Sequence, residues 1–311
     1  MLDPRRLRIL LAVAEEKSFT AAAQRLGLTQ SAVSQQMAAL ERETGVPLLT
    51  RTSQGVSLTE AGGRLAERSY RLLAEITAVE AELLTAGETR PEIRLGAFSS
   101  AGLELLPQAL KAFSAVRPDV RVALVSLPPG DITTPLWDGS IHALLTWEYS
   151  FAPQPLNRRL AQFRLLDDPL LAVLPAGHPL AASADIALAD LADEPWMARA
   201  HGEPYENAYE TMCRIAGFEP EIAFRVDDYE ALQGLVAAGL GVSMAPALSL
   251  VPRRPDVVIR PISRPAFTRQ VSALTLVDGP RMAPLADFID ILRQTAEAIH
   301  DASGQVRDAR W

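Results

Sequence analysis

The amino-acid sequence predicts three parts: a mainly α-helical winged helix-turn-helix domain, a long linker helix, and an α/β domain of two lobes. Two short helical segments flank a glycine within residues 18–36, and one long amphipathic stretch follows at 59–84. Beyond Pro91, short apolar runs alternate with helical periods, which indicates an α/β architecture. With 311 residues, 48% of them hydrophobic, the chain can bury a core in each part.

The stretch from 18 to 36 is typical of a helix-turn-helix. Ser18 or Thr20 can cap a first helix, Gly27 supplies the permissive backbone that ends it, and Thr29 can cap a second helix. The turn between the helices is about four residues long, as the motif requires. An apolar repeat upstream predicts a bracing helix that contains Leu7, Leu10, Leu11 and Ala14.

The second helix of this motif separates apolar from polar side chains. Val33, Met37 and Leu40 recur at i, i+4 and i+7, so they form one buried stripe. Short amides and hydroxyls suit base edges in the major groove, and Gln can make a bidentate contact to adenine. We therefore predict a DNA-reading helix, with an ordinary surface helix as the alternative. The reading side chains are Gln30, Ser31, Ser34 and Gln35.

Two short runs at 48–51 and 56–58 surround a turn that contains Gly55. This pattern predicts a β-hairpin, the wing. We expect Arg51, beside the turn, to contact the DNA backbone, which adds affinity but little sequence information. The remaining predicted DNA-contacting residues are Ser18, Thr20 and Thr29.

The stretch from 59 to 84, with Thr59 as its N-cap, predicts one long helix of about 39 Å. Apolar residues recur along it at spacings of 7, 4, 3 and 4, which indicates a coiled-coil seam. A long amphipathic helix packed only on its own domain is the alternative. Linker residues at 87–91 then break the pattern. The predicted dimerisation residues are Leu65, Leu72, Ile76, Val79 and Leu83.

The chain beyond Pro91 alternates predicted strands with helices near 103–113 and 229–238. Its length of about 220 residues suffices for two small α/β lobes. The predicted strands are 93–98, 120–125, 143–147, 170–174, 196–198, 222–226, 242–245 and 271–277.

These segments together resemble the LysR-type transcriptional regulators. The resemblance rests on 19–23, Leu26, 29–36, 40–41, Gly45, Leu48, Arg51, 55–56 and 58–62, and continues more weakly through 174–181 and 235–246. The sequence departs from the family pattern at Ser31, where Pro is common, at Leu49, where Phe is usual, and at His142, where Asp is usual.

The resemblance implies a winged helix-turn-helix at 1–58, a linker and dimerisation helix at 59–87, and an effector-binding domain at 88–311 that is similar to periplasmic binding proteins. The first lobe would comprise about 91–165 and 268–300, and the second lobe about 166–267. A small-molecule effector would bind in the cleft between them. It also implies a homodimer or homotetramer that binds double-stranded DNA and regulates transcription.

Ligands of open α/β sheets gather at the carboxyl ends of strands, near helix N-termini that favour anions. Ser99 and Ser100 follow one predicted strand, and Trp147 and Arg199 lie at the ends of two others. These positions favour a small organic anion, because hydroxyls and helix amides can hold a carboxylate while basic groups offset its charge. The candidate effector residues are Ser99, Ser100, Pro128, Trp147, Arg199 and His201.

Each candidate also has a plainer explanation. The serines can cap a helix, Trp147 can fill a core, and Arg199 can be a solvated charge. Pro128 can merely shape a loop. A neutral or cationic effector facing Glu148 and Glu203 is the alternative ligand. A DNA-binding regulator whose lobes bind no ligand is the alternative function, and an α/β enzyme is the other.

The net charge of −8 is unevenly distributed: residues 1–65 carry +2 and the remainder −10. Because residues 1–65 are only weakly basic, we expect one copy to have modest nonspecific affinity for DNA. Useful binding should therefore need two or more copies acting together. No apolar run approaches a membrane span, and the charged start lacks the apolar stretch of a signal peptide, so we expect a cytoplasmic protein.

Enzyme motifs are absent from the sequence: there is no Gly-x-Ser-x-Gly elbow, phosphate loop, or Gly-x-Gly-x-x-Gly after a strand. The adjacent acids Asp167 and Asp168 are expected to be solvated turn residues. No histidine pair has the spacing of a helical zinc site, so no metal or cofactor is expected. Cys213 is the one cysteine, so it cannot form an internal disulfide. It lies in a helical pattern with Met212 and Ile215 and is expected to be a buried structural thiol, with redox sensing as the alternative.

Overall fold

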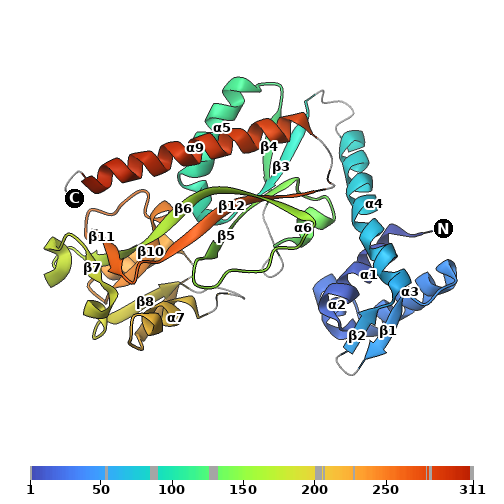
Figure 1. The fold of residues 1–311 in the computed structure, drawn as a ribbon, viewed down its shortest axis with the longest axis horizontal. Helices are drawn as coiled ribbons and strands as arrows, with labels where there is room; N and C mark the ends of the chain where they lie inside the picture. The colour runs from blue at the N-terminus through green and yellow to red at the C-terminus, as the bar shows by residue number, and fades with distance from the viewer. Residues whose placement is uncertain are drawn as a thin grey trace. The chain divides into compact units, whose positions relative to one another are not determined.

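The computed structural model describes residues 2–52, 55–84, 90–125, 132–199, 205, 207–226, 228–277, 279 and 282–308. The chain divides into two compact units, each described by itself below (Figure 1). The first unit contains residues 1–89 with 133–142 and 276–281, and the second contains the rest.

The first unit is a winged helix-turn-helix followed by a long helix, as predicted. Ser18 Oγ accepts a hydrogen bond from the Ala21 amide at 3.3 Å, and Thr29 Oγ1 accepts one from the Ala32 amide at 3.2 Å. Gly27 ends the first motif helix at φ 64°. The elements are α1 (Pro4–Glu16), α2 (Phe19–Leu26), α3 (Gln30–Thr44), β1 (Leu49–Thr52), β2 (Gly55–Leu58) and α4 (Glu60–Leu84).

The wing is fastened to α3 by a carboxylate to which the sequence analysis assigned no structural role. Glu41 Oε1 accepts from the backbone amides of Leu48 and Leu49, at 2.8 and 3.1 Å. Leu48 is in turn buried in the core of this unit. The end of the recognition helix and the start of the wing are therefore held together.

Helix α4 packs closely against the start of the wing. Thr59 Oγ1 accepts from the Gly62 amide at 3.0 Å, which confirms the predicted N-cap. A Cβ at Gly62 would lie 2.0 Å from the Leu48 carbonyl oxygen, so only glycine permits this approach. Ala66 and Leu73 of α4 are buried in the core of the unit. A segment from far along the sequence, 133–142 with α6 (Thr134–Trp137), belongs to the same unit, which the sequence did not predict.

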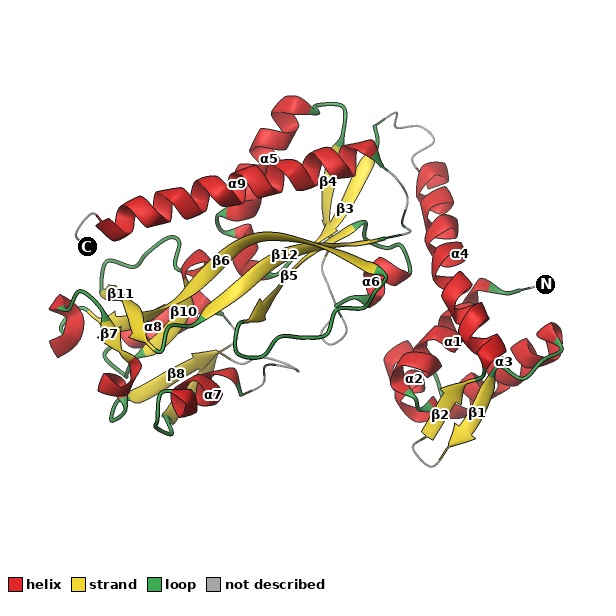
Figure 2. Ribbon diagram, viewed as in Figure 1, coloured by secondary structure: helices red, strands yellow, loops and turns green. Residues whose placement is uncertain are grey.

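The second unit is built on an eight-stranded mixed sheet in which β3 pairs in parallel with both β4 and β5, while β12 is antiparallel to β5 (Figure 2). The strand order is β4-β3-β5-β12-β6-β11-β7, with β10 paired to β6. The strands are β3 (Glu92–Gly96), β4 (Arg121–Val125), β5 (Ala143–Tyr149), β6 (Leu160–Pro175), β7 (Ile186–Ala187), β10 (Ser243–Pro246), β11 (Val257–Arg264) and β12 (Thr268–Leu276). A separate parallel pair is formed by β8 (Pro195–Arg199) and β9 (Glu221–Val226).

Two lobes share the long strand β6. Leu165 and Leu166 lie in the first core, whereas Leu170 lies in the second. In the first lobe, α5 (Leu105–Val116) and α9 (Ala283–Asp308) lie on the same side of the sheet (Figure 2). The second lobe contains α7 (Ala208–Ile215) and α8 (Tyr229–Ala237). Short 3-10 helices complete the unit: η1 (Ser99–Gly102), η2 (Pro179–Ala182), η3 (Leu188–Leu191) and η4 (Ala247–Ser249).

The α/β class was predicted correctly, but several elements were not. Strands β7 and β11 and the first half of β6 were missed. Residues 257–264 contain Pro261 and two arginines, which hide the alternation of a strand. Among the described helices, none is long and apolar enough to cross a membrane.

Candidate DNA-reading surface and effector site

The polar face of α3 is open to solvent. Gln30, Ser31 and Gln35 are exposed and Ser34 is half-buried. The opposite stripe of Val33, Met37 and Leu40 is buried, so the predicted separation of the two faces is confirmed. This arrangement leaves a row of amides and hydroxyls on an otherwise anchored helix, which suits contact with base edges.

The flanking polar residues have mixed surroundings. Thr20 and Thr29 are exposed, and Ser18 is half-buried because it caps α2. Thr29 Oγ1 lies 3.1 Å from Ser31 Oγ, so these two hydroxyls form one polar cluster at the start of α3. Arg51 pairs with Val56 in the hairpin register, but its side chain lies outside the described residues.

Helix α3 is braced by a residue that the sequence reasoning missed. Arg6 Nε donates to Gln36 Oε1 at 3.0 Å, and its Nη1 forms an ion pair with Glu43. Arg6 thereby ties α1 to two turns of the recognition helix. Arg6 and Gln36 lie 30 positions apart in the sequence, so no local pattern predicts their contact.

A second apolar stripe runs along α4 beside the buried one. Leu72 and Val79 are 46% and 45% exposed, and Ile76 is half-buried. Leu65, also assigned to the predicted seam, packs partly against the core of its own unit. The side chain of Leu83 lies outside the described residues. Large exposed aliphatic groups at this spacing fit a partner helix.

A buried ion pair lies where the two lobes meet. Arg269 of β12 donates through Nε to Asp168 Oδ2 of β6 at 2.7 Å, and through Nη2 to Ser100 Oγ at 2.7 Å. Asp168 Oδ1 also accepts from the Leu248 amide at 3.1 Å. Burial raises the pKa of the Asp168 carboxyl, while Arg269 and the Leu248 amide oppose that rise. Burial lowers the pKa of Arg269, but the charge and hydrogen bond of Asp168, together with the nearby phenols of Tyr229 and Tyr149, outweigh burial and raise this pKa.

Aromatic rings surround this pair. The Arg269 guanidinium carbon lies 4.9 Å from the Phe98 ring centroid and 5.5 Å from that of Trp147. Trp147 is half-buried, packs against both lobe cores, and stacks on Tyr205 with centroids 4.9 Å apart. Burial raises the pKa of Tyr205 to about 12, so its phenol stays neutral at physiological pH.

Arg199 brings a second guanidinium near the phenols of Tyr229 and Tyr149. It ends β8, as expected, and lies 4.9 Å over the ring of Tyr229. Burial raises the pKa values of Tyr229 and Tyr149. The positive charges of Arg269 and Arg199 partly oppose this rise at both phenols. Two arginines and several neutral aromatic hydroxyls therefore share one region.

The local structure around the two predicted effector serines differs from expectation. Ser99 and Ser100 lie in the four-residue η1, and the helix expected to contain Leu103 begins only at Leu105, as α5. Ser99 is exposed, whereas Ser100 is 2% exposed and accepts from Arg269. Neither serine caps a helix, because the N-cap position of η1 is Phe98.

The expectation that Asp168 is solvated is also wrong, since it is 1% exposed inside β6. Its neighbour Asp167 is half-buried and forms an ion pair with Arg164 at 2.6 Å. Strand alternation sends these adjacent carboxylates to opposite faces. Pro128 and His201, the other predicted effector residues, lie outside the described residues.

The described residues offer no site for a metal ion: in that part of the chain, no three His, Cys, Asp or Glu side chains converge. His142, half-buried just before β5, stands apart from any such set. Cys213 is fully buried in the second lobe, and burial raises its thiol pKa to about 12.

Comparison with protein families matches nearly the whole chain. Residues 4–63 match the bacterial regulatory helix-turn-helix protein, lysR family, and residues 86–297 match the LysR substrate binding domain. The chain belongs to the LysR family of transcriptional regulators.

Individual LysR-family relatives cover the full length. The probable HTH-type transcriptional regulator LrrA of Synechococcus elongatus is 30% identical over 295 residues, which is 94% of this chain and 97% of LrrA. The DNA-binding transcriptional dual regulator OxyR of Escherichia coli is 27% identical, covering 96% of this chain and 98% of OxyR. Full-length CbnR complexed with its target DNA matches with a TM-score of 0.59 at 26% identity, covering 94% of this chain and all of CbnR.

Membership in the LysR family decides the functional class. The chain is a DNA-binding transcriptional regulator with a helix-turn-helix module and a substrate-binding domain, and it is not an enzyme.

Proposed function

We propose that this LysR-type regulator reads its operator with the exposed face of α3 and responds to a small organic anion at the lobe junction. The row of solvent-open amides and hydroxyls over a buried apolar stripe on α3 supports the first part. Gln30, Ser31, Ser34 and Gln35 contact base edges. Ser18, Thr20, Thr29 and Arg51 contact the phosphate backbone.

Two or more copies act together on DNA. The weakly basic module provides little nonspecific attraction, so affinity depends on joining modules. The stripe formed by exposed Leu72 and Val79 and half-buried Ile76 pairs α4 with the same helix of a second copy. We retain 1–58, 59–87 and 88–311 as the functional parts of the chain, which acts in the cytoplasm where its DNA lies.

The effector carries a carboxylate and a flat apolar part. The guanidinium of Arg199, which lies 4.9 Å over the Tyr229 ring at the end of β8, provides the attraction for the carboxylate. Trp147 and Tyr205, stacked on each other, offer flat faces beside it. A neutral or cationic effector has less support. Glu148 Oε2 already accepts from the Gln154 amide at 3.1 Å, and Glu203 lies outside the described residues.

Thermal-shift screening of the full chain tests the effector proposal. Aromatic and aliphatic carboxylates are compared with their uncharged primary amides. A ligand at a hundred times its dissociation constant stabilises the fold by about 2.7 kcal/mol. We expect a carboxylate to raise the melting temperature of the parent, and Arg199→Gln to abolish the rise while Arg225→Gln, on the neighbouring strand, keeps it. A hit among the amides alone, or a shift that survives Arg199→Gln, would reject the anion and its site.

A further inference from the structure

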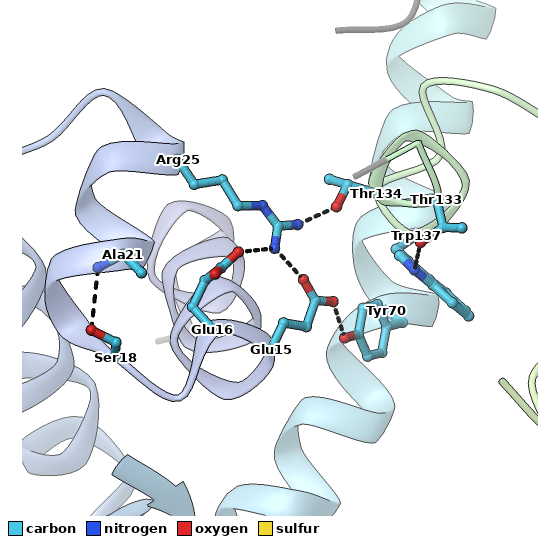
Figure 3. A network of polar contacts seen from close by, with 9 residues as sticks. All are labelled: Glu15, Glu16, Ser18, Ala21, Arg25, Tyr70, Thr133, Thr134 and Trp137. Atoms are coloured by element: carbon cyan, nitrogen blue, oxygen red, sulfur yellow. Dashed lines mark hydrogen bonds and ion pairs between the residues drawn. The ribbon is translucent and has the colours of Figure 1, made fainter. Parts of the chain in front are cut away.

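A closed ring of contacts joins four helices of the first unit (Figure 3). Tyr70 of α4 donates to Glu15 Oε1 of α1 at 2.7 Å, and Glu15 Oε2 accepts from Arg25 Nη1 of α2 at 2.6 Å. Arg25 Nη2 donates to Thr134 Oγ1 of α6. The ring closes where the Trp137 indole meets the Tyr70 phenol, with centroids 5.1 Å apart.

Burial reinforces these polar contacts. Trp137 is 6% exposed, and its Nε1 donates to Thr133 Oγ1 at 3.2 Å. Leu136 beside it is fully buried. Arg25 also contacts Glu16 Oε1 at 3.1 Å, so one guanidinium holds two carboxylates of α1 and a hydroxyl of α6. The last turn of α2 is thereby fixed from two sides.

The docked segment is continuous with the lobe junction. Residues 133–142 lead directly into β5, which begins at Ala143 and carries Trp147. Trp147 lies 5.5 Å from the Arg269 guanidinium and packs against both lobe cores. Because β5 is hydrogen-bonded to β12 and β3, a displacement of Trp147 would be shared by the strand that follows directly on this segment. The partner of Thr134 in the ring, Arg25, belongs to α2, which is the first helix of the helix-turn-helix.

We propose that residues 133–142 are a coupling segment that transmits the state of the lobe junction to the helix-turn-helix through the Arg25–Thr134 and Tyr70–Trp137 contacts. The idea that an effector starts the signal rests on the proposed effector site. The docking of residues 133–142 on α2 and α4 does not depend on that proposal. By linkage, DNA binding alters the docking equilibrium by the same factor as docking alters DNA affinity.

Chemical crosslinking tests the docking without DNA or effector. Arg25→Cys and Thr134→Cys are combined in a Cys213→Ala background and treated with a short bismaleimide. We expect an adduct within one chain, which migrates as a monomer on a denaturing gel. The two single-cysteine variants serve as matched controls and give no such adduct. An absent adduct, or one that links only two chains, would overturn the docking.

The rate of the same crosslink tests the coupling through the Tyr70–Trp137 contact, which the two introduced cysteines leave in place. The probe is a duplex that the full parent chain selects from a random pool. We expect saturating duplex to change the rate by about fivefold or more. Trp147→Ala is expected to change it as well, whereas Met212→Ala, a core truncation in α7, leaves it unchanged. Equal rates with and without duplex and in Trp147→Ala would overturn the coupling. Failure to select any duplex would reject the proposed DNA reading, whereas the docking result would stand.

Discussion

Arg269 and Asp168 form an ion pair of 2.7 Å between adjacent strands of the sheet, and each is 1% exposed. The pair lies where the chain passes between lobes, since β6 carries residues of both cores, and Phe267 of the second core directly precedes β12, which carries Val271 of the first. Removing one partner of such a pair leaves an uncompensated buried charge, whereas removing both does not.

Asp168→Ala should therefore lower the free energy of unfolding by about 3–5 kcal/mol, as measured by urea denaturation. Asp167→Ala is the matched control: its carboxylate is half-buried and pairs with the exposed Arg164, so it should cost only about 0–1 kcal/mol. Combining Asp168→Ala with Arg269→Met should restore much of the loss. Equal costs for Asp167→Ala and Asp168→Ala would mean that the pair is not buried in solution.

Two adjacent glycines of α4 should respond oppositely to alanine. At Gly62 the new Cβ would lie 2.0 Å from the Leu48 carbonyl oxygen, so Gly62→Ala should destabilise by about 1–3 kcal/mol. At Gly63 nothing lies within 4 Å, so Gly63→Ala should stabilise the helix by up to about 1 kcal/mol. Thermal melts of both variants check this. Similar melting temperatures for the two would contradict the close approach of α4 to the wing.

Ile76→Asp should abolish assembly, because it places a carboxylate where a partner helix would exclude water, at a cost of several kcal/mol. Light scattering should report a monomer for this variant. Glu75→Ala, at the adjacent exposed position, should keep the parent oligomer. If Ile76→Asp kept it too, the stripe would not be a dimer seam.

The Cys213 thiol should be unreactive in the native protein. Its pKa is raised from 9.0 to about 12 by burial, so no appreciable thiolate exists near pH 8. A disulfide reagent should label it only after unfolding. The folded state also holds this proton more tightly than the unfolded state, so stability should fall as pH rises from about 9 to 12. Cys213→Ala should lose that part of the pH dependence, and rapid native labelling at pH 8 would contradict the burial.

What the sequence predicted well depends on local spacing. Ser18, Thr29 and Gly27 cap helices within a few residues of themselves, and the apolar repeat of α3 determines its buried face. The junction was predicted poorly for the converse reason. Arg269 meets partners 101 and 169 positions away, and no local pattern announces such pairs. Adjacent acids look alike in sequence, yet burial within β6 separates Asp168 from Asp167.

Selection of operators from a random duplex pool by the full chain, followed by sequencing, tests DNA reading by α3 most directly. We expect enriched duplexes with two symmetry-related half-sites, one for each copy of the reading helix. Gln35→Ala should lose about 1–3 kcal/mol and relax preference at one base pair per half-site, whereas Arg51→Ala should weaken binding to all sequences alike. An unchanged motif and affinity for Gln35→Ala, or no enriched motif at all, would contradict the assignment of α3 as the reading helix.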